Sequence, residues 1–478
     1  MIQVPFFRGQ TVAVFGLARS GLATARALLE GGAHVIAWDD SEKGRKEGSA
    51  QGLHLAEPAS WDWPRIAALI LSPGVPLTHP APHAVVKAAQ AAGAEIIGDV
   101  ELFMRALAAD PVRSAPENSG RVPLICVTGT NGKSTTTALI AHLLQRNGFI
   151  AQAGGNIGRP VLDLDAPAPG IAYVLEVSSF QIDLTPSLKP DAGVLTNITP
   201  DHLDRHGTMD AYVAVKRRLF AKQTGGDVAV IGVDDEFGAD SCTLITAKGG
   251  PLVIPVSVGQ VLGRGIYVID GVLFDAMDSP AAPVVDLKVC PGLPGPHNWQ
   301  NAGVAYAAVR HLVRDPREIG RAMATFPGLA HRIETVGRLG KVRFINDSKA
   351  TNADAAAKAL ACFENIHWII GGIAKSGGIE SLTGYFPRVA KAYLIGKAQD
   401  DFARTIDGAV AYERCGDLET AMRRATAEAL QSAAIAPVVL LSPACASFDQ
   451  FKDFEDRGES FRRIAQQLIR DAGEGQAA

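Results

Sequence analysis

Cysteines are few in this sequence and show no paired spacing. The 478 residues contain six, at positions 126, 242, 290, 362, 415 and 445, with no Cys-x-x-Cys pair and no histidine at zinc-finger spacing. A disulfide framework and a structural zinc site are therefore not expected. Scattered free thiols are typical of a protein in a reducing compartment, which predicts a cytoplasmic location.

The sequence also lacks an excess of positive charge and a long apolar run. There are 46 Lys and Arg against 50 Asp and Glu, a formal net charge of -4, so nucleic acid is not an expected partner. No apolar stretch approaches the roughly 18 residues of a membrane span. The N-terminal apolar stretch, residues 11–18, is followed by Arg19 and not by a small-residue cleavage site, which indicates a strand and not a signal peptide.

The composition that remains is that of a folded α/β protein. Hydrophobic residues make up 47% of the chain and charged residues 20%, a normal balance for a globular protein. Aromatic residues are only 6%, whereas glycine occurs 49 times, as expected for many tight strand–turn–helix units. At roughly 100 to 200 residues per domain, the length predicts three α/β domains.

Alternating apolar and polar stretches suggest where these domains lie. Strands at 11–15 and 35–38 flank a helix at 22–30, while residues 110–123 are rich in Pro, Ser and charge and predict an exposed loop near a domain boundary. Further strands are predicted at 342–345, 368–370, 393–395 and 438–441, separated by helical stretches. We predict a Rossmann-like domain at 1–98, a central domain with a mostly parallel sheet at 99–329, and a C-terminal Rossmann-like domain at 330–478.

A glycine-rich loop follows the apolar strand at 124–127 and precedes a helix. Its sequence is Thr128-Gly129-Thr130-Asn131-Gly132-Lys133-Ser134-Thr135. Backbone N–H groups of such a loop bind phosphate at a helix N-terminus, the lysine reaches the terminal phosphates, and the serine hydroxyl holds Mg²⁺. Val127 stands where the general phosphate loop has its first glycine, so a glycine-rich turn with an exposed lysine is the alternative interpretation.

A magnesium site also needs oxygen ligands from carboxylates. The strand at 173–175 ends at Glu176, and a polar cluster at 201–207 follows the strand at 192–195. Histidine and carboxylates at this density are able to bind a cation, although a solvated strand end and a hydrated loop would have the same sequences. Lys216, on a predicted helix at 212–220, is by itself indistinguishable from a surface lysine.

The N-terminal segment allows a different interpretation. Gly16 and Gly21, followed by Asp39, partly match the dinucleotide-binding fingerprint, but Ala18 replaces the middle glycine that lets the backbone approach a pyrophosphate. A nicotinamide-dependent oxidoreductase and a non-catalytic nucleotide-binding regulator are therefore alternatives to an ATP-dependent enzyme.

Taken together, ordered blocks along nearly the whole chain resemble the Mur ligase family, the ATP-dependent amide-forming enzymes of peptidoglycan precursor synthesis. The blocks lie at 128–135, 176–181, 197–204, 298–301, 331–332 and 346–352. The C-terminal block at 441–451, with Phe454 and Arg457-Gly458, resembles the D-glutamate-adding branch, and the Asp-Asn-Pro-Arg block expected of the meso-diaminopimelate-adding relatives is absent from the sequence. This resemblance implies a central P-loop ATPase-like domain and a monomeric ligase for UDP-N-acetylmuramoyl-L-alanine, D-glutamate and ATP.

The mechanism that the resemblance implies passes through an acyl phosphate. The acceptor carboxylate attacks the γ-phosphate of ATP, and the amine of D-glutamate then displaces phosphate. Two anions meet in the first step, so positive charge must surround them. Lys133, His202, Lys216 and two Mg²⁺ ions are the expected catalytic groups.

The resemblance also assigns the metal ligands. Ser134 and Glu176 are expected to hold one Mg²⁺, and Glu176, His202 and Lys216 the second. In this family the lysine at the position of Lys216 is carbamylated by CO₂, which turns a cation that Mg²⁺ would repel into a carboxylate-like oxygen ligand.

The remaining implied contacts are with substrates. For ATP they are Gly129, Thr130, Asn131, Gly132, Lys133, Ser134 and Thr135, with Asn301 at the base, Asp347 at the ribose, and Arg332 and Lys349 at the phosphates. For the UDP-linked acceptor they are Arg19, Ser20, Asp39, Asp40, Ser72 and Asn156. For D-glutamate they are Thr351, Lys375, Ser447 and the backbone of Phe454. Because the ATP contacts come from two predicted domains, we expect the site to exclude water only when those domains close.

Overall fold

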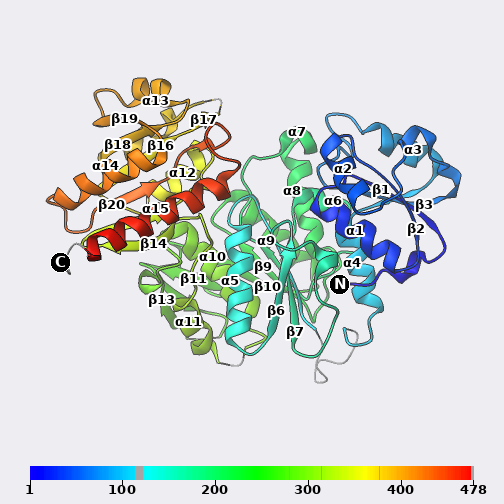
Figure 1. Cartoon of the computed structure of the whole chain (residues 1–478). Coiled ribbons are helices and arrows are strands. Elements are labelled where there is room, and N and C mark those ends of the chain that lie inside the picture. Colours follow the sequence, from blue (N-terminus) through cyan, green and yellow to red (C-terminus); the bar gives the residue numbers. More distant parts are fainter. Residues whose placement is uncertain (114–121, 279, 314, 376, 475–478) are drawn as a thin grey trace. The chain divides into compact units, whose positions relative to one another are not determined.

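The computed structural model describes residues 1–113, 122–278, 280–313, 315–375 and 377–474 (Figure 1). The chain divides into two compact units, one of Met1–Asp286 with Asn298–Met323 and the other of Leu287–His297 with Ala324–Ala478. The first unit contains a four-stranded and a nine-stranded sheet, and the second a six-stranded sheet with a two-stranded ladder. Within the described ranges, no helix combines the length and the apolar character needed to cross a membrane.

The N-terminal part of the first unit is a parallel sheet in the order β2-β1-β3-β4. The predicted strand at 11–15 is confirmed, and residues 12–15 are buried, as expected for a parallel strand covered on both faces. The helix predicted at 22–30 begins earlier, at Arg19, so Arg19 and Ser20 belong to its first turn and not to the preceding loop. The elements are η1 (Pro5–Phe7), β1 (Thr11–Phe15), α1 (Arg19–Glu30), β2 (His34–Trp38), α2 (Glu42–Ala50), η2 (Pro58–Ser60), η3 (Trp63–Arg65), β3 (Ile66–Leu71), α3 (Ala84–Ala92), β4 (Glu95–Ile97) and α4 (Asp99–Ala109).

The central sheet of the same unit has the order β13-β12-β11-β10-β9-β8-β5-β7-β6. From β11 to β6 in this order, β5 included, all strands run parallel to one another, whereas β12 and β13 add an antiparallel edge. All five residues of β5 are buried between β7 and β8. The elements are β5 (Leu124–Thr128), α5 (Lys133–Arg146), β6 (Ile150–Gly155), η5 (Val161–Asp163), β7 (Ile171–Glu176), α6 (Ser179–Asp183), β8 (Ala192–Leu195), α7 (Leu203–His206), α8 (Met209–Arg217), η6 (Arg218–Phe220), β9 (Val228–Gly232), α9 (Glu236–Lys248), β10 (Leu252–Val258), β11 (Ile266–Ile269), β12 (Val272–Asp275), β13 (Ala282–Asp286), α10 (Pro296–Val309) and α11 (Pro316–Ala324).

The second unit is built on a sheet in the order β14-β15-β20-β16-β18-β19. Only β14 is antiparallel to its neighbour, and fully buried Trp368 on β16 lies in the core on one face. The elements are η7 (Leu287–Val289), β14 (Glu334–Leu339), β15 (Val342–Asn346), α12 (Ala353–Leu360), β16 (Ile366–Gly371), β17 (Ile373–Ala374), η8 (Glu380–Arg388), β18 (Val389–Ile395), α13 (Gln399–Ile406), β19 (Tyr412–Gly416), α14 (Leu418–Gln431), β20 (Val438–Leu441), β21 (Cys445–Ala446) and α15 (Phe454–Glu474).

The stretch predicted as an exposed loop, 110–123, is only partly described. Residues 114–121 lie outside the described residues, and the flanking residues are less exposed than predicted. Arg113 is ion-paired with Asp191 at 2.6 Å, with both side chains only 12% exposed, and Val122 is fully buried. The exposed-loop prediction is therefore wrong at Arg113 and Val122, which both pack inward, whereas Pro111 is exposed as predicted. All six cysteines are free thiols.

Candidate active site

The glycine-rich loop joins β5 to α5, as predicted. Strand β5 ends at Thr128 and α5 begins at Lys133, so residues 129–132 form the turn between them. Ser134 and Thr135 occupy the first turn of α5, where unpaired backbone N–H groups carry partial positive charge. The turn therefore has the form of an anion-binding site.

Two positions of this loop require glycine. Gly129 has a φ of +145° and Gly132 a φ of +82°, which residues with a Cβ rarely adopt. A Cβ on Gly129 would lie 2.0 Å from Oγ1 of Thr196, and a Cβ on Gly132 would lie 2.1 Å from Oδ1 of Asn301. Asn301 also accepts a hydrogen bond from Oγ1 of Thr136 at 3.3 Å, so it supports the loop from α10, and its contact with the base of ATP stays a prediction.

The segment after β8 fixes the loop. Oγ1 of Thr196 donates to the Asn131 carbonyl at 2.6 Å, and Oδ1 of Asn197 accepts from the Asn131 N–H at 3.0 Å. Oγ1 of Thr130 donates to the Thr199 carbonyl at 3.1 Å. The loop is therefore anchored to the neighbouring strand before any ligand binds.

Two lysines converge on one carbonyl of the loop. Nζ of Lys133 donates to the carbonyls of Gly129 at 3.0 Å and Thr130 at 2.8 Å, and Nζ of Lys216, on α8, donates to the Gly129 carbonyl at 2.9 Å. Lys216 is almost completely buried. Burial and the charge of Lys133 lower the pKa of Lys216 to about 7, against an opposing effect of Asp201. A large fraction of this amine is therefore neutral, and so nucleophilic, near neutral pH.

Glu176 lies beside the strand that leads into the loop. It pairs in register with Val127, and its side chain is only 1% exposed. Oε1 accepts a hydrogen bond from Nδ2 of Asn156 at 2.7 Å, whereas Oε2 is buried with no hydrogen-bond partner. A buried carboxylate oxygen without a donor is costly unless a cation compensates it. Glu176 therefore fits the role of a cation ligand.

The ligand set around Glu176 suits magnesium better than a metal held wholly by protein. Among the described residues, no group of three or more His, Cys, Asp or Glu side chains is arranged to hold a metal ion. Mg²⁺ commonly takes one or two carboxylates and completes its shell with water and substrate phosphates. The phosphate loop beside Glu176 is where such phosphates would bind.

His202 is linked to Lys216 and the glycine-rich loop through aromatic contacts. Its side chain is 45% exposed, and its ring centroid is 4.9 Å from that of Phe180 and 6.4 Å from that of Tyr212. Nζ of Lys216 lies 4.5 Å from the centroid of the Tyr212 ring, and the Tyr212 hydroxyl is 3.2 Å from Oγ1 of Thr130. Tyr212 thus connects His202, Lys216 and the phosphate loop.

The predicted UDP residues gather at the carboxyl edge of the first sheet. Oγ of Ser72, after β3, donates to the Gly16 carbonyl at 2.9 Å. Asp39, after β2, accepts hydrogen bonds from the N–H of Leu17 at 2.6 Å and from the hydroxyl of Ser41 at 2.6 Å. Burial alone would raise the pKa of Asp39, but the hydrogen bonds from Ser41 and Leu17 outweigh it and lower the pKa.

Other predicted acceptor residues lie around the same edge. The guanidinium of Arg19 donates to the carbonyl of Gly158 at 3.2 Å, close in sequence to Asn156. Oδ2 of exposed Asp40 is 3.1 Å from Nε2 of His83. Ser20 lines one small cavity together with Ser72.

In the second unit, residues predicted for ATP and for D-glutamate are in contact. Nζ of Lys349 lies 3.7 Å from the centroid of the Phe454 ring, and Oγ of Ser348 donates to the Phe454 carbonyl at 2.8 Å. The buried guanidinium of Arg457 donates to Oγ and the carbonyl of Ser348 at 2.9 and 2.8 Å. The N–H of Thr351 donates to the Lys349 carbonyl at 2.8 Å. Arg457 thus joins the 346–352 block to the start of α15.

Asp347 is buried in the same block. Its Oδ1 accepts from the N–H of Ile333 at 3.2 Å and its Oδ2 from Oγ of Ser442 at 2.8 Å. Burial raises the pKa of Asp347 to about 7, although Ser442, Ile333 and Arg332 act in the opposite direction. The backbone of Arg332 is held by the Leu329 carbonyl at 3.2 Å. The ribose contact of Asp347 and the phosphate contact of Arg332 stay predictions.

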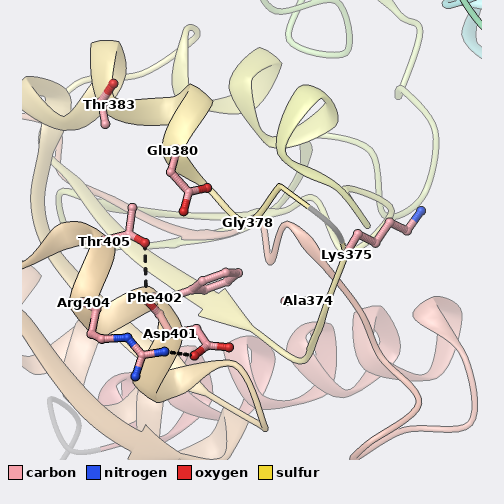
Figure 2. A pocket seen from close by; sticks show the side chains of 9 residues that line it. All are labelled: Ala374, Lys375, Gly378, Glu380, Thr383, Asp401, Phe402, Arg404 and Thr405. Carbon is pink, nitrogen blue, oxygen red and sulfur yellow. Dashed lines mark hydrogen bonds and ion pairs between the residues drawn. The ribbon is translucent and has the colours of Figure 1, made fainter.

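Lys375 and Ser447 follow the paired strands β17 and β21. Ser447 is buried, whereas Lys375 is exposed and lines a cavity of about 650 Å³. In Figure 2 the Lys375 side chain extends away from Glu380 and from the α13 side chains that form the opposite wall. Lys375 is the only predicted D-glutamate residue among the described residues that line this cavity.

Three residues that hold the central site have no assigned role in the sequence analysis. Tyr212 lies one helical turn before Lys216, so both residues are on one face of α8. This spacing could have predicted from the sequence that the two side chains are neighbours. Thr196 and Asn197 follow β8, and their contact with the loop depends on β8 lying beside β5. Asn197 opens the 197–204 block of the sequence, but strand order across a sheet has no local sequence signal, so the contact of these two residues with the loop was not predictable.

Known proteins resemble the chain in sequence and in fold. The family description "Mur ligase middle domain" matches residues 127–309, and "Mur ligase, glutamate ligase domain" matches residues 331–445. A protein of Caulobacter sp. (strain K31) named UDP-N-acetylmuramoylalanine--D-glutamate ligase is 54% identical over 462 residues, 97% of each chain. A protein of the same name from Caulobacter vibrioides (strain NA1000 / CB15N) is 53% identical over 478 residues, the whole of both chains.

Two solved structures share the fold at low sequence identity. UDP-N-acetylmuramate-alanine ligase from Thermotoga maritima has a TM-score of 0.57 and 16% identity, covering 96% of this chain and 99% of that one. UDP-N-acetylmuramoyl-L-alanyl-D-glutamate--2,6-diaminopimelate ligase has a TM-score of 0.57 and 21% identity, covering 86% and 94%. They match the multidomain α/β architecture with mostly parallel sheets that the sequence predicts. By its sequence, the chain belongs to the Mur ligase family and groups with the relatives named UDP-N-acetylmuramoylalanine--D-glutamate ligase.

Proposed function

We propose that this chain joins D-glutamate to the alanyl carboxylate of UDP-N-acetylmuramoyl-L-alanine, using ATP. The observation that carries the proposal is the buried, unpartnered carboxylate oxygen of Glu176 beside a phosphate loop with two lysines. The relative at 54% identity supports the choice of substrates through its name. The oxidoreductase alternative has no comparable support.

In the first step, the acceptor carboxylate attacks the γ-phosphorus of ATP and ADP leaves, which gives an acyl phosphate. Lys133 and the N–H groups at the start of α5 would hold the phosphates and offset their charge. Mg²⁺, when bound, neutralises phosphate oxygens and brings the two anions together. Ser134 and Glu176 would hold one Mg²⁺ ion, and Glu176, His202 and Lys216 would hold the second.

Lys216 requires a chemical change to serve as a magnesium ligand. Its neutral amine, populated because the pKa is near 7, would add to CO₂ with loss of a proton and form a carbamate anion. The buried position beside the Gly129 carbonyl limits access of water to this group. Intact-mass measurement under gentle conditions would show one added CO₂, absent in Lys216→Arg.

In the second step, the amine of D-glutamate attacks the acyl carbon, and phosphate leaves with the former carboxylate oxygen. Thr351, Lys375, Ser447 and the backbone of Phe454 would hold D-glutamate. Asn301, Arg332, Asp347 and Lys349 would bind ATP with the loop, and Arg19, Ser20, Asp39, Asp40, Ser72 and Asn156 would bind the UDP-linked acceptor.

The organisation of the chain follows from the same proposal. We propose domains at 1–98, 99–329 and 330–478, acting as a monomer in the cytoplasm, where ATP is available. Size-exclusion chromatography with light scattering would test the monomer.

Phosphate release tests the proposed function. Purified protein with ATP and Mg²⁺ should release phosphate only when both UDP-N-acetylmuramoyl-L-alanine and D-glutamate are present. L-Glutamate serves as the matched control and should support little turnover. Release that does not depend on D-glutamate would refute the assignment.

A further inference from the structure

Arg205 joins two segments that the proposed function assigns to different ends of the acceptor. Its Nη1 donates to the Gly74 carbonyl at 2.9 Å, and its Nη2 to the carbonyls of Val75 at 2.8 Å and Pro73 at 3.4 Å. These carbonyls belong to the loop after β3, while Arg205 lies on α7 in the central part of the same unit. A single side chain therefore binds three consecutive carbonyls of a distant segment.

On one side, Arg205 holds the loop that begins with Ser72. The N–H of Ser72 donates to the Phe15 carbonyl at 2.9 Å, and its hydroxyl donates to Gly16, so the loop is tied to the end of β1. The N–H of Val75 donates back to the Ser72 carbonyl at 3.0 Å, which closes a tight turn. The carbonyls that Arg205 binds are thus part of a rigid turn next to the proposed UDP residues.

On the other side, Arg205 lies next to the proposed metal ligand His202. Its guanidinium carbon is 4.6 Å from the centroid of the Phe180 ring, and the same ring lies 4.9 Å from the His202 ring. The two segments also approach closely at a second point, because a Cβ on Gly207 would lie 2.9 Å from Nε2 of His79. The spacing between the 72–75 turn and the His202 segment is therefore fixed by direct contact.

We propose that Arg205 is a positioning residue that sets the distance between the UDP end and the reacting carboxylate of the acceptor. The proposal rests on the proposed function, since it concerns a substrate held at both ends. A planar guanidinium suits this role because it donates in several directions at once while stacking on an aromatic ring. The alignment of the acceptor carboxylate with the phosphate depends strongly on this spacing. The affinity of the site for either end of the acceptor alone depends on it far less.

The test compares Arg205→Ala and Arg205→Lys with Arg26→Ala. Arg26, on α1, is a matched control because it joins the N-terminal and central parts elsewhere, through Asp163 at 3.1 and 3.3 Å. Measurements are kcat and KM for the acceptor, KM for ATP, the inhibition constant of free UDP against the acceptor, and the melting temperature.

For Arg205→Ala we expect kcat/KM for the acceptor to fall on the order of tenfold to a hundredfold. The inhibition constant of UDP and the KM for ATP should stay within about twofold, because each end site is intact. Arg205→Lys should recover part of the loss, since its ammonium keeps a charge but reaches fewer carbonyls. Arg26→Ala should behave as wild type.

If Arg205→Ala kept the wild-type kcat/KM for the acceptor, the proposal would be overturned. It would also be overturned if the variant lost UDP affinity and melting temperature in parallel with kcat/KM, because that result marks a merely structural role. If Arg205→Ala does not fold, Arg205→Lys decides by the same comparison of acceptor against UDP. Wild-type protein that fails to turn over the acceptor and D-glutamate would overturn the proposed function, and this proposal with it. If the wild-type protein turned over both substrates and the Arg205 variants had unchanged kcat/KM, only this proposal would be overturned.

Discussion

At the scale of single residues, the centre of the site brings two lysines and one buried carboxylate together at the glycine-rich loop. Lys133 and Lys216 both donate to the Gly129 carbonyl, and Glu176 keeps one buried oxygen without a partner. The unpartnered oxygen of Glu176 is costly to the free protein and becomes favourable when a cation binds. All three residues are predicted from the sequence, but the burial of Lys216 and Glu176 and the carbonyl that the two lysines share are visible only in the structure.

Glu176→Gln tests this trade between stability and function. The amide keeps the shape of the side chain and the acceptor for Asn156 but removes a buried charge. The melting temperature of the magnesium-free protein should therefore rise, and its free energy of unfolding should increase by about 1 kcal/mol. Ligation should fall at least about a hundredfold because a cation ligand is lost. Differential scanning fluorimetry and phosphate release measure the two effects.

The control for this variant is Glu101→Gln. Glu101 is equally buried but accepts hydrogen bonds from Arg105 and Ser187, so its neutralisation should destabilise the protein. A lower melting temperature in Glu176→Gln, matching that of Glu101→Gln, would contradict our interpretation of the unpartnered oxygen.

Asp347→Asn should change the dependence of stability on pH. Burial raises the pKa of Asp347 from 3.8 to about 7, so between these pH values the folded protein binds more protons than the unfolded chain. The contribution of this group to stability is therefore fully present below about pH 4 and is lost as the pH rises to 7. Asparagine can keep both hydrogen-bond partners without the charge, so the variant should gain melting temperature over wild type progressively from pH 5 to pH 8.

Asp400→Asn is the comparison for this pH series, because Asp400 is exposed. Its difference from wild type should be small and nearly constant over the same range. A constant difference in Asp347→Asn as well would show that Asp347 is ionised throughout.

At the scale of elements, the sequence predicts only part of the strands. The edge strand β2 and several interior strands are found, whereas fully buried β9, inside the central sheet, is missed. The strands at 124–127 and 438–441 are continuous apolar runs, because both faces of an interior parallel strand are covered, and the structure has them as β5 and β20. Strands β6, β12, β13 and β14 lie at or near sheet edges with mixed exposure, and we did not predict them. The loop after β5 was predicted because glycine and lysine spacing carries a physical requirement, whereas its anchors on β8 depend on strand order.

Gly132→Ala tests the strand–loop–helix element. The new methyl group would collide with Oδ1 of Asn301 in addition to the strain of a positive φ. Either the loop or the Asn301 side chain that supports it must shift, so kcat/KM for ATP should fall about tenfold or more. Gly148→Ala separates the two causes, because Gly148 has a φ of +88° but open space around its Cβ position. We expect Gly148→Ala to cost about 1 kcal/mol of stability and to leave ATP kinetics unchanged. Equal kinetic effects in both variants would mean that backbone strain, and not the collision with Asn301, causes the loss of activity.

At the scale of the whole molecule, each part of the chain carries one share of the proposed reaction. The first unit contains the proposed UDP residues and the phosphate loop, and the second contains Lys349, Thr351 and Phe454 in one contact network. Length and composition predicted the three α/β parts, but not how the chain divides into compact units: residues 287–297 belong with the second unit, although they precede part of the first. The amino-acid composition does not indicate where a chain leaves one compact unit and later returns to it.

The most direct test of the central claim follows one oxygen atom. With UDP-N-acetylmuramoyl-L-alanine labelled with ¹⁸O in its alanyl carboxylate, together with ATP, Mg²⁺ and D-glutamate, mass spectrometry should detect one ¹⁸O in the released phosphate for each glutamyl amide formed. That transfer is required if the carboxylate oxygen first attacks phosphorus and then leaves with it. Unlabelled phosphate, or labelled amide product without label in phosphate, would contradict the account.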